Sequence, residues 1–270
     1  MALLEVDGIG VRFGGVVALS ELSFSIAEHE ICALIGPNGA GKTTFFNVVS
    51  RLYEPTEGSI TFAGQDLLSL PPHAIAGLGI ARTFQNLALV PGLTVLENVM
   101  IGAHARTSGG FWGSALNLPV RSAERRTRAD AMELLGDLGL AAVAEHPAAG
   151  LPYGTLKRIE LARALAARPR LLMLDEPASG LTHGEVAELG ATIQRLREQF
   201  ELTVLLVEHH MGMVMSVAEH VVVMEFGQKI ADGTPCLIEA ARQKSSPRVD
   251  LPTPGRAATT IIWPPRKPVV

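Results

Sequence analysis

Cysteine is scarce in this chain, which has two cysteines among 270 residues. Cys32 and Cys236 are isolated and lack the short spacing of metal-binding cysteines. Cys32 also lies in the middle of an apolar run, where a thiol packs like a small hydrophobic group. We therefore assign the two cysteines no redox or metal chemistry.

Long apolar runs are absent as well. Although 47% of the residues are hydrophobic, no run approaches the roughly 18 apolar residues that a membrane-spanning helix needs. The first residues do not join a basic region to an apolar one, so we expect no signal peptide and a protein that stays in the cytosol. The net charge of −4 gives no general attraction to nucleic acid or anionic membrane, so a membrane role would require a protein partner.

A glycine-rich segment, GPNGAGKT at residues 36–43, fits the phosphate-binding pattern G-x-x-x-x-G-K-[ST]. The apolar residues 31–35 before it predict a buried strand of a parallel sheet, and residues 42–52 predict a helix after it. This order lets backbone N–H groups point into one concavity at the positive end of the helix. We therefore predict a triphosphate site rather than a plain glycine-rich turn, with Lys42 on the β- and γ-phosphates and Thr43 holding Mg²⁺. The residues expected to hold the nucleotide here are Gly36, Pro37, Asn38, Gly39, Ala40, Gly41, Lys42, Thr43 and Thr44.

Two acidic residues follow the apolar run at residues 171–174. Asp175 stands at the end of this predicted strand, where a carboxylate would complete the Mg²⁺ site. Glu176 comes next and is placed to accept a proton from an attacking water, as a general base does. The alternative is a helix-capping pair, which the strand before it and Pro177 after it disfavour.

Three further side chains have a functional and a structural interpretation. Gln85 would orient a water or join the Mg²⁺ shell, or it would lie on the surface. His209 follows a predicted strand and would emerge at the same sheet edge as the acidic pair, or serve only the structure. Phe13 would stack on a base or pack in the core.

Helical and strand patterns alternate along the chain, which favours an α/β fold with a mostly parallel sheet. Residues 3–35 alternate apolar and polar positions and predict an N-terminal antiparallel subdomain. Residues from about 87 to 155 predict an inserted helical subdomain. We expect strands at 56–63, 171–174 and 203–207, a turn at 64–66, helices at 129–138, 156–167 and 185–199, and a hairpin at 221–232.

The domain assignment follows from these patterns. Residues 1–244 form one nucleotide-binding domain, and the proline-rich residues 245–270 are expected to be disordered or extended. Inside the helical subdomain, four arginines fit a solvated helix face, with contact to lipid or a partner as the alternative. These are Arg121, Arg125, Arg126 and Arg128.

Five motifs occur in the order found in ATP-binding-cassette (ABC) ATPases, which the chain resembles from about residue 3 to residue 240. They are GPNGAGKTT at 36–44, ARTFQN at 81–86, LPYG at 151–154, LLMLDEP at 171–177 and VEHHM at 207–211. Further details resemble one branch, the ATPase subunits of branched-chain amino-acid importers: FGG at 13–15, LTVLENV at 93–99, and tyrosine before glycine in LPYG. The resemblance implies a P-loop NTPase of ABC type, whose helical subdomain touches a membrane-spanning permease.

The resemblance also implies an ATPase that uses MgATP and forms homo- or heterodimers, head to tail, around two ATP molecules. Such a subunit lies on the cytoplasmic face of the inner membrane, serves a periplasmic solute-binding protein indirectly, and has no nucleic-acid partner. The resemblance also assigns roles by position. Phe13 would stack on adenine, Gln85 would link the two lobes, and Glu176 would be the general base. His209 would be the γ-phosphate switch, and Leu151, Tyr153 and Gly154 would form the signature that faces ATP across the dimer.

Three positions depart from the family pattern. Pro152 stands where this branch has serine or alanine, Thr182 where it has asparagine, and His210 where aspartate is common. We expect weaker dimer closure and retained hydrolysis. Two alternatives stay open: a non-transport ABC ATPase, and a module that ATP locks because hydrolysis is weak. The solute is open among branched-chain amino acids, other amino acids, amides and urea.

Overall fold

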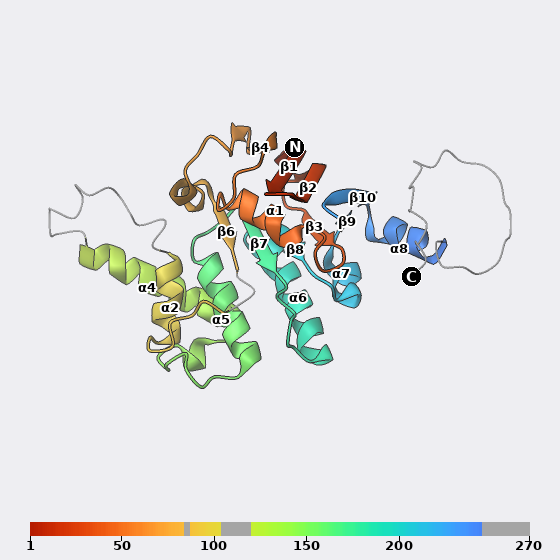
Figure 1. Cartoon of the computed structure of the whole chain (residues 1–270). Coiled ribbons are helices and arrows are strands. Elements are labelled where there is room, and N and C mark those ends of the chain that lie inside the picture. Colours follow the sequence, from red (N-terminus) through yellow and green to blue (C-terminus); the bar gives the residue numbers. More distant parts are fainter. Residues whose placement is uncertain (84–86, 104–119, 245–270) are drawn as a thin grey trace.

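The computed structural model describes residues 1–83, 87–103 and 120–244 (Figure 1). Two sheets organise this part of the chain, one of four strands and one of six. In Figure 1 the smaller sheet lies at the top beside the N-terminus, and three helices gather at the lower left. These helices are α2 (Val95–Gly102), α4 (Val120–Asp137) and α5 (Tyr153–Leu165). Sheets with helices against them confirm the predicted α/β class.

The smaller sheet is antiparallel, with the strand order β2-β1-β4-β5. β1 (Ala2–Phe13) and β2 (Val16–Ala27) pair on either side of a turn at Gly14-Gly15, as predicted. β4 (Glu57–Phe62) pairs with the other side of β1, and the short β5 (Gln65–Asp66) completes the sheet. The alternating pattern arises because one face of these strands packs on the core.

The larger sheet has the order β10-β9-β3-β8-β7-β6. Its parallel strands are β3 (Ile31–Ile35), β6 (Ile80–Arg82), β7 (Leu171–Asp175), β8 (Thr203–Val207) and β9 (His220–Glu225), and β10 (Gln228–Gly233) is antiparallel to β9. Every residue of β3, β7 and β8 is buried, which explains their continuous apolar runs. Because parallel strands end at one edge, the segments after these three strands meet there.

Further helices cover the larger sheet and its ends. They are α1 (Lys42–Val49), α6 (His183–Gln199), α7 (Met211–Val217) and α8 (Pro235–Lys244), with 3₁₀ turns η1 (Pro72–Ala74), η2 (Ala76–Leu78) and η3 (Ala141–Val143). Helices α2, α4 and α5 share one core with α6, through residues such as Val99, Leu135, Ile159 and Ile193. We keep residues 87–155 as the proposed helical subdomain.

Several predicted boundaries were wrong. α1 ends three residues early because Arg51 has a φ of 58° and the N–H of Leu52 turns back to the carbonyl of Asn47. α4 begins at Val120, so the arginine-rich stretch is helical, and α5 begins at Tyr153 instead of residue 156. Gln65–Asp66 forms a strand where a turn was expected, since the reversal is made at residues 63 and 64.

The sequence patterns missed the elements β6, α2, α7 and α8. These span three to ten residues, which is too short for periodicity to identify. The hairpin at 221–232 and the strand at 203–207 were predicted correctly. The predicted tail at 245–270 lies outside the described residues.

Candidate nucleotide-binding and hydrolysis site

The loop between β3 and α1 has a backbone shape that requires glycine. Gly39 and Gly41 have φ angles of 80° and 100°, in the left-handed region. A Cβ on Gly36 would lie 2.2 Å from the carbonyl oxygen of Met224, and one on Gly41 would lie 2.7 Å from that of Ala18. Gly41 has no side chain to cap α1, so the first N–H groups of the helix keep their capacity for an anion.

The predicted phosphate-binding residues differ in exposure. Pro37, Asn38, Gly39 and Thr43 are exposed, Gly36, Gly41 and Thr44 are half-buried, and Ala40 and Lys42 are buried. Lys42 is 7% exposed, and its Nζ donates to the carbonyl oxygens of Gly36 at 2.8 Å and Pro37 at 3.0 Å. Burial lowers the pKa of Lys42, against the opposing effect of the charges on Glu176 and Asp175. The ammonium group is thus held within the loop, with the acidic pair nearby.

Asp175 is the last residue of β7 and is 3% exposed. Its Oδ2 lies 2.9 Å from Nη2 of Arg82, and its backbone N–H donates to Oγ1 of Thr83 at 3.3 Å. The same guanidinium donates to Oδ1 of Asn47 at 2.7 Å and lies 5.2 Å from the ring centroid of Phe46. These contacts fix the end of β7 to the helix that follows the phosphate-binding loop.

Glu176 has a φ of 49°, a left-handed conformation that costs a non-glycine residue about 1–2 kcal/mol. Its N–H donates to the carbonyl oxygen of Val207 at 2.9 Å, so the chain stays tied to β8 before it turns away. A strained residue of this kind persists only where its surroundings fix it, as at many catalytic sites.

The donors of the predicted metal site suit Mg²⁺. The Thr43 hydroxyl and the Asp175 carboxylate are hard oxygen ligands, and Mg²⁺ in nucleotide sites uses few protein ligands besides phosphate oxygens and waters. In the described ranges no cluster of three or more histidine, cysteine or acidic side chains forms a protein-only metal cage. Gln85, the third predicted ligand, lies outside the described residues.

His209 emerges two residues after β8, at the same sheet edge as the acidic pair, because Val207 is the register partner of Asp175. Its side chain is 57% exposed. His209 lines a pocket of about 260 Å³ together with Gly36 and Pro37 of the phosphate-binding loop. The fold therefore brings the predicted switch residue beside the predicted phosphate site.

Phe13 ends β1 and is 47% exposed. Its ring meets that of Tyr53 edge to face, with the centroids 5.1 Å apart. The next strand reaches the phosphate-binding loop through Ala18 and Leu19, which crowd Gly41. An exposed aromatic at this corner has a free face for a base.

Among the predicted signature residues, Gly154 lies against the start of α6. Pro152 is the N-cap of α5, and Tyr153 begins the helix. A Cβ on Gly154 would lie 2.7 Å from Oε1 of Glu185, whose carboxylate completes a capping box with Thr182. Pro152 and Gly154 line a pocket of about 90 Å³ that shares no residue with the pocket at His209. Within one chain, the signature and the phosphate-binding loop thus line separate pockets.

Three residues of this region were missed by sequence reasoning. Arg82 gave no signal because its partner is 93 positions away. Tyr53 follows a helix and has no motif of its own. Glu208 is a charge directly after an apolar strand, the signal that identified Asp175, and it would have been found by the same argument.

A glycine loop at a helix N-terminus, with a lysine inside it and an acidic pair at a neighbouring strand end, defines a P-loop nucleotide-binding protein. The ABC transporter family matches residues 19–179, more than half of the chain. The chain belongs to this family and is an ABC-type ATPase.

Named relatives match most of the chain. The high-affinity branched-chain amino acid transport ATP-binding protein BraF of Pseudomonas aeruginosa is 42% identical over 234 residues, which cover 86% of this chain and 92% of BraF. The corresponding protein LivG of Escherichia coli K12 is 40% identical with the same coverage. A crystal structure of a nucleotide-free ATP-binding cassette from an ABC transporter has a TM-score of 0.78 and 30% identity, covering 92% of this chain and 96% of the cassette.

The ADP conformation of an ATP-binding cassette of an ABC transporter is similar too, with a TM-score of 0.76 and 30% identity, covering 87% of this chain and 91% of that one. None of the described helices combines the length and the apolar character that crossing a bilayer demands.

Proposed function

We propose that the chain is the MgATP-hydrolysing subunit of an importer for branched-chain or related amino acids. The identity of 42% to BraF across 92% of that protein supports this assignment. Permease subunits would hold the chain at the cytoplasmic face of the inner membrane, and a periplasmic solute-binding protein would act through them. A non-transport role is less well supported, because the relatives BraF and LivG are named transport ATP-binding proteins.

The observation that carries the proposal is the meeting of Lys42, Asp175 and Glu176 at one end of the sheet. Lys42 would leave the carbonyls of Gly36 and Pro37 and place its charge on the β- and γ-phosphates. Thr43 and Asp175 would hold Mg²⁺, which neutralises charge on the phosphate oxygens. The loop N–H groups and α1 would bind the remaining phosphate charge.

Glu176 would take the proton of the attacking water. Glu176 directly follows β7, and its charge acts to raise the pKa of Lys42 against the effect of burial, which supports this role. His209 would donate to the γ-phosphate from the end of β8, and Phe13 would stack on adenine. Leu151, Tyr153 and Gly154 would face the ATP held by a second cassette. Gly154 lines a pocket apart from the phosphate-binding loop, which supports this role.

The test uses two variants that separate binding from turnover. Glu176→Gln keeps the shape but cannot accept the proton, so we expect normal ATP binding and turnover lower by about 10²- to 10⁴-fold. Lys42→Ala removes a charge from the phosphates and should abolish ATP binding. Glu198→Gln, at an exposed position of α6, is the control and should match wild type. ATP binding by calorimetry and steady-state turnover would be measured on all three.

Turnover of Glu176→Gln close to that of wild type would refute the general-base assignment. The solute is tested separately, by uptake of labelled leucine, alanine and urea in cells that lack the chain and in cells that carry Glu176→Gln. Loss of leucine uptake in both supports the amino-acid assignment. Loss of urea uptake alone would exclude it.

A further inference from the structure

A buried carboxylate that no step above uses lies between the two catalytic loops. Glu208 is 0% exposed and directly follows β8. Its Oε1 accepts the backbone N–H of Ala178 at 2.7 Å. Its Oε2 accepts the backbone N–H groups of His209 at 3.0 Å and His210 at 3.2 Å. One side chain is thus bonded to the segment after β7 and to the segment after β8.

Burying a carboxylate is costly unless hydrogen bonds satisfy it. Here three N–H donors satisfy it, and they belong to the backbone segments that follow β7 and β8. Ala178 lies two residues beyond Glu176, and the N–H of Ser179 donates to the carbonyl of Glu176 at 3.1 Å. The left-handed turn at Glu176 is therefore fixed at its start by Val207 and just beyond by the Glu208 carboxylate.

We propose that Glu208 is a positioning residue that holds the general-base turn and the switch-histidine turn in one geometry. The inference rests on the roles proposed for Glu176 and His209. Glu208 itself is shielded from solvent, and both of its carboxylate oxygens accept backbone N–H groups, so it acts through the two turns. It sets the distance between Glu176 and His209, because both turns are bonded to the two oxygens of one planar group.

The two carboxylate oxygens of Glu208 bond to different turns, so substitutions of Glu208 test the proposal directly. In Glu208→Gln one oxygen becomes an NH₂ group, which cannot accept a hydrogen bond. Glutamine therefore keeps either the bond to Ala178 or the bonds to His209 and His210, but not both. Glu208→Asp keeps the charge and shortens the reach by one methylene, so it too is expected to hold only one turn.

The first experiment compares kcat and KM for ATP in wild type, Glu208→Gln and Glu208→Asp. We expect kcat to fall by about 10- to 100-fold, since small displacements of catalytic groups have effects of that size. KM should stay within about threefold, because the contacts of Lys42 and the loop are untouched. Glu219→Gln is the control, and its kcat should match wild type. Its carboxylate also accepts a backbone N–H, from Ile31 at the start of β3, the end of that strand opposite the phosphate-binding loop.

The second experiment measures amide hydrogen exchange without nucleotide, which is independent of activity. In Glu208→Gln either the amide of Ala178 or those of His209 and His210 should lose protection, while the amides of β3 keep it. A third comparison adds His209→Ala to Glu208→Gln. If Glu208 acts partly through His209, the two losses in kcat should combine to less than their product.

Normal kcat in both Glu208 variants would overturn the proposal. So would equal loss of kcat and ATP affinity with general loss of amide protection, which is the result of a purely structural role. If Glu208→Gln fails to fold, Glu208→Asp and the exchange of the three amides in wild type still decide. Failure of the roles proposed for the catalytic groups is distinguishable, because then Glu176→Gln itself would keep the turnover of wild type.

Discussion

Pro152 occupies the N-cap position of α5, where serine would bond the N–H groups of the first turn. Proline has no side-chain acceptor, yet the helix begins at the next residue, and its φ of −55° suits a helix start. The departure from the family signature therefore leaves the helix intact. What it removes is a hydroxyl that could cap the helix and donate to a phosphate of a facing cassette.

We predict that Pro152→Ser strengthens ATP-driven dimers or raises ATPase activity. A hydrogen bond to a charged phosphate contributes about 1.5–3 kcal/mol, so the gain in the dimer equilibrium should be at most about 100-fold. Pro152→Ala is the matched control, since it loses the proline ring without gaining a hydroxyl. Sedimentation with MgATP measures the effect, and equal dimerisation of the serine and alanine variants would mean that backbone N–H groups alone make this contact.

Single residues also show what the sequence allowed us to predict. Lys42 and Asp175 were identified because local spacing determines their placement: a loop between strand and helix, and a charge after an apolar run. Arg82 was missed because its bond to Asp175 exists only after β6 pairs with β7, and a three-residue strand leaves no pattern. A single sequence does not reveal side chains whose role depends on contacts between distant segments.

The contact between α2 and α5 is tight at a single glycine. A Cβ on Gly102, the last residue of α2, would lie 1.9 Å from the carbonyl oxygen of Arg163 in α5. No real side chain tolerates that distance, so the two helices approach this closely only because the residue is glycine. Gly136 in α4 is different, since a Cβ there would meet nothing within 4 Å.

We predict opposite effects of the same substitution at these two glycines. Gly102→Ala should lower the free energy of unfolding by about 1–3 kcal/mol, because α2 must shift. Gly136→Ala should raise it by about 0.5–1 kcal/mol, because alanine favours the helix. Urea unfolding of both variants checks this, and stabilisation by Gly102→Ala would show that the helices are packed less closely than described.

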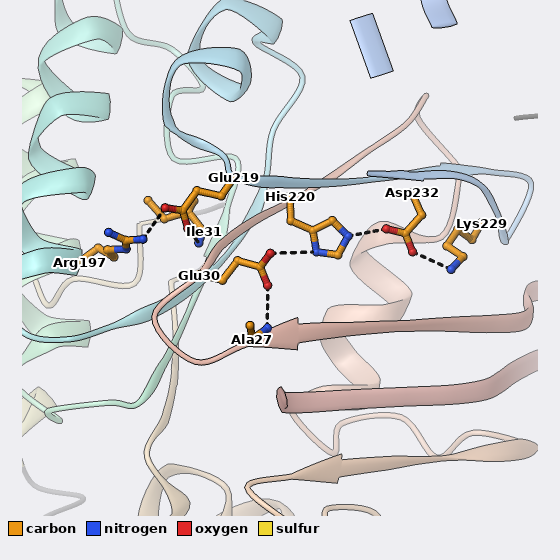
Figure 2. A network of polar contacts seen from close by, with 8 residues as sticks. All are labelled: Ala27, Glu30, Ile31, Arg197, Glu219, His220, Lys229 and Asp232. Atoms are coloured by element: carbon orange, nitrogen blue, oxygen red, sulfur yellow. Dashed lines mark hydrogen bonds and ion pairs between the residues drawn. The ribbon is translucent and has the colours of Figure 1, made fainter. Parts of the chain in front are cut away.

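A polar network joins the strands β3, β9 and β10 at the other end of the sheet (Figure 2). His220 begins β9, and Figure 2 shows its ring between the carboxylates of Glu30 and Asp232, with Lys229 beyond. The hydrogen bond to Asp232 is the main cause that raises the pKa of His220 to about 12. The same bond lowers the pKa of Asp232 to about 2.

These shifts predict how stability depends on pH. The contribution of His220 is full below its unfolded pKa of about 6.5 and is lost as pH rises toward 12. The contribution of Asp232 is present above its ordinary value of 3.8 and is lost as pH falls toward 2. His220→Gln should therefore destabilise the protein most between about pH 4 and 6.5, and less at pH 9.

Urea unfolding of wild type and His220→Gln at pH 5.5 and pH 9 measures this difference. The exposed His73→Gln serves as the control and should be neutral at both values. A loss of stability that is the same at pH 5.5 and pH 9 would mean that the ring acts by packing and not by charge.

At the scale of the whole molecule, the architecture was largely predictable. Continuous apolar runs marked β3, β7 and β8, because these strands are buried on both faces, and alternation marked β1 and β2. The strand order could not be predicted from the sequence, since it depends on pairing between strands that are far apart in the chain. That order puts β8 between β3 and β7, and so brings His209 to the phosphate-binding loop.

The described residues also divide the proposed ATP contacts into two surfaces. The phosphate-binding loop packs against Ala18 and Met224, whereas the signature glycine, Gly154, packs against Glu185 at the start of α6. A nucleotide bound by both surfaces would therefore need two chains. This requirement for two chains can be tested by mixing two inactive variants, because a site formed by one chain alone would not regain activity.

We predict that two inactive variants restore activity when mixed. Lys42→Ala removes the phosphate lysine, and Gly154→Asp sets a negative charge toward Glu185 and the facing phosphates, so each variant alone should be inactive. In a mixed dimer, one site combines the intact lysine of one chain with the intact signature of the other. Since about half of the dimers are mixed and each has one working site, turnover should reach roughly a quarter of wild type.

Mixing Lys42→Ala with Glu176→Gln is the control, because their mixed dimer has no site with both residues intact. If the first mixture stays as inactive as this control, the two surfaces do not share one ATP.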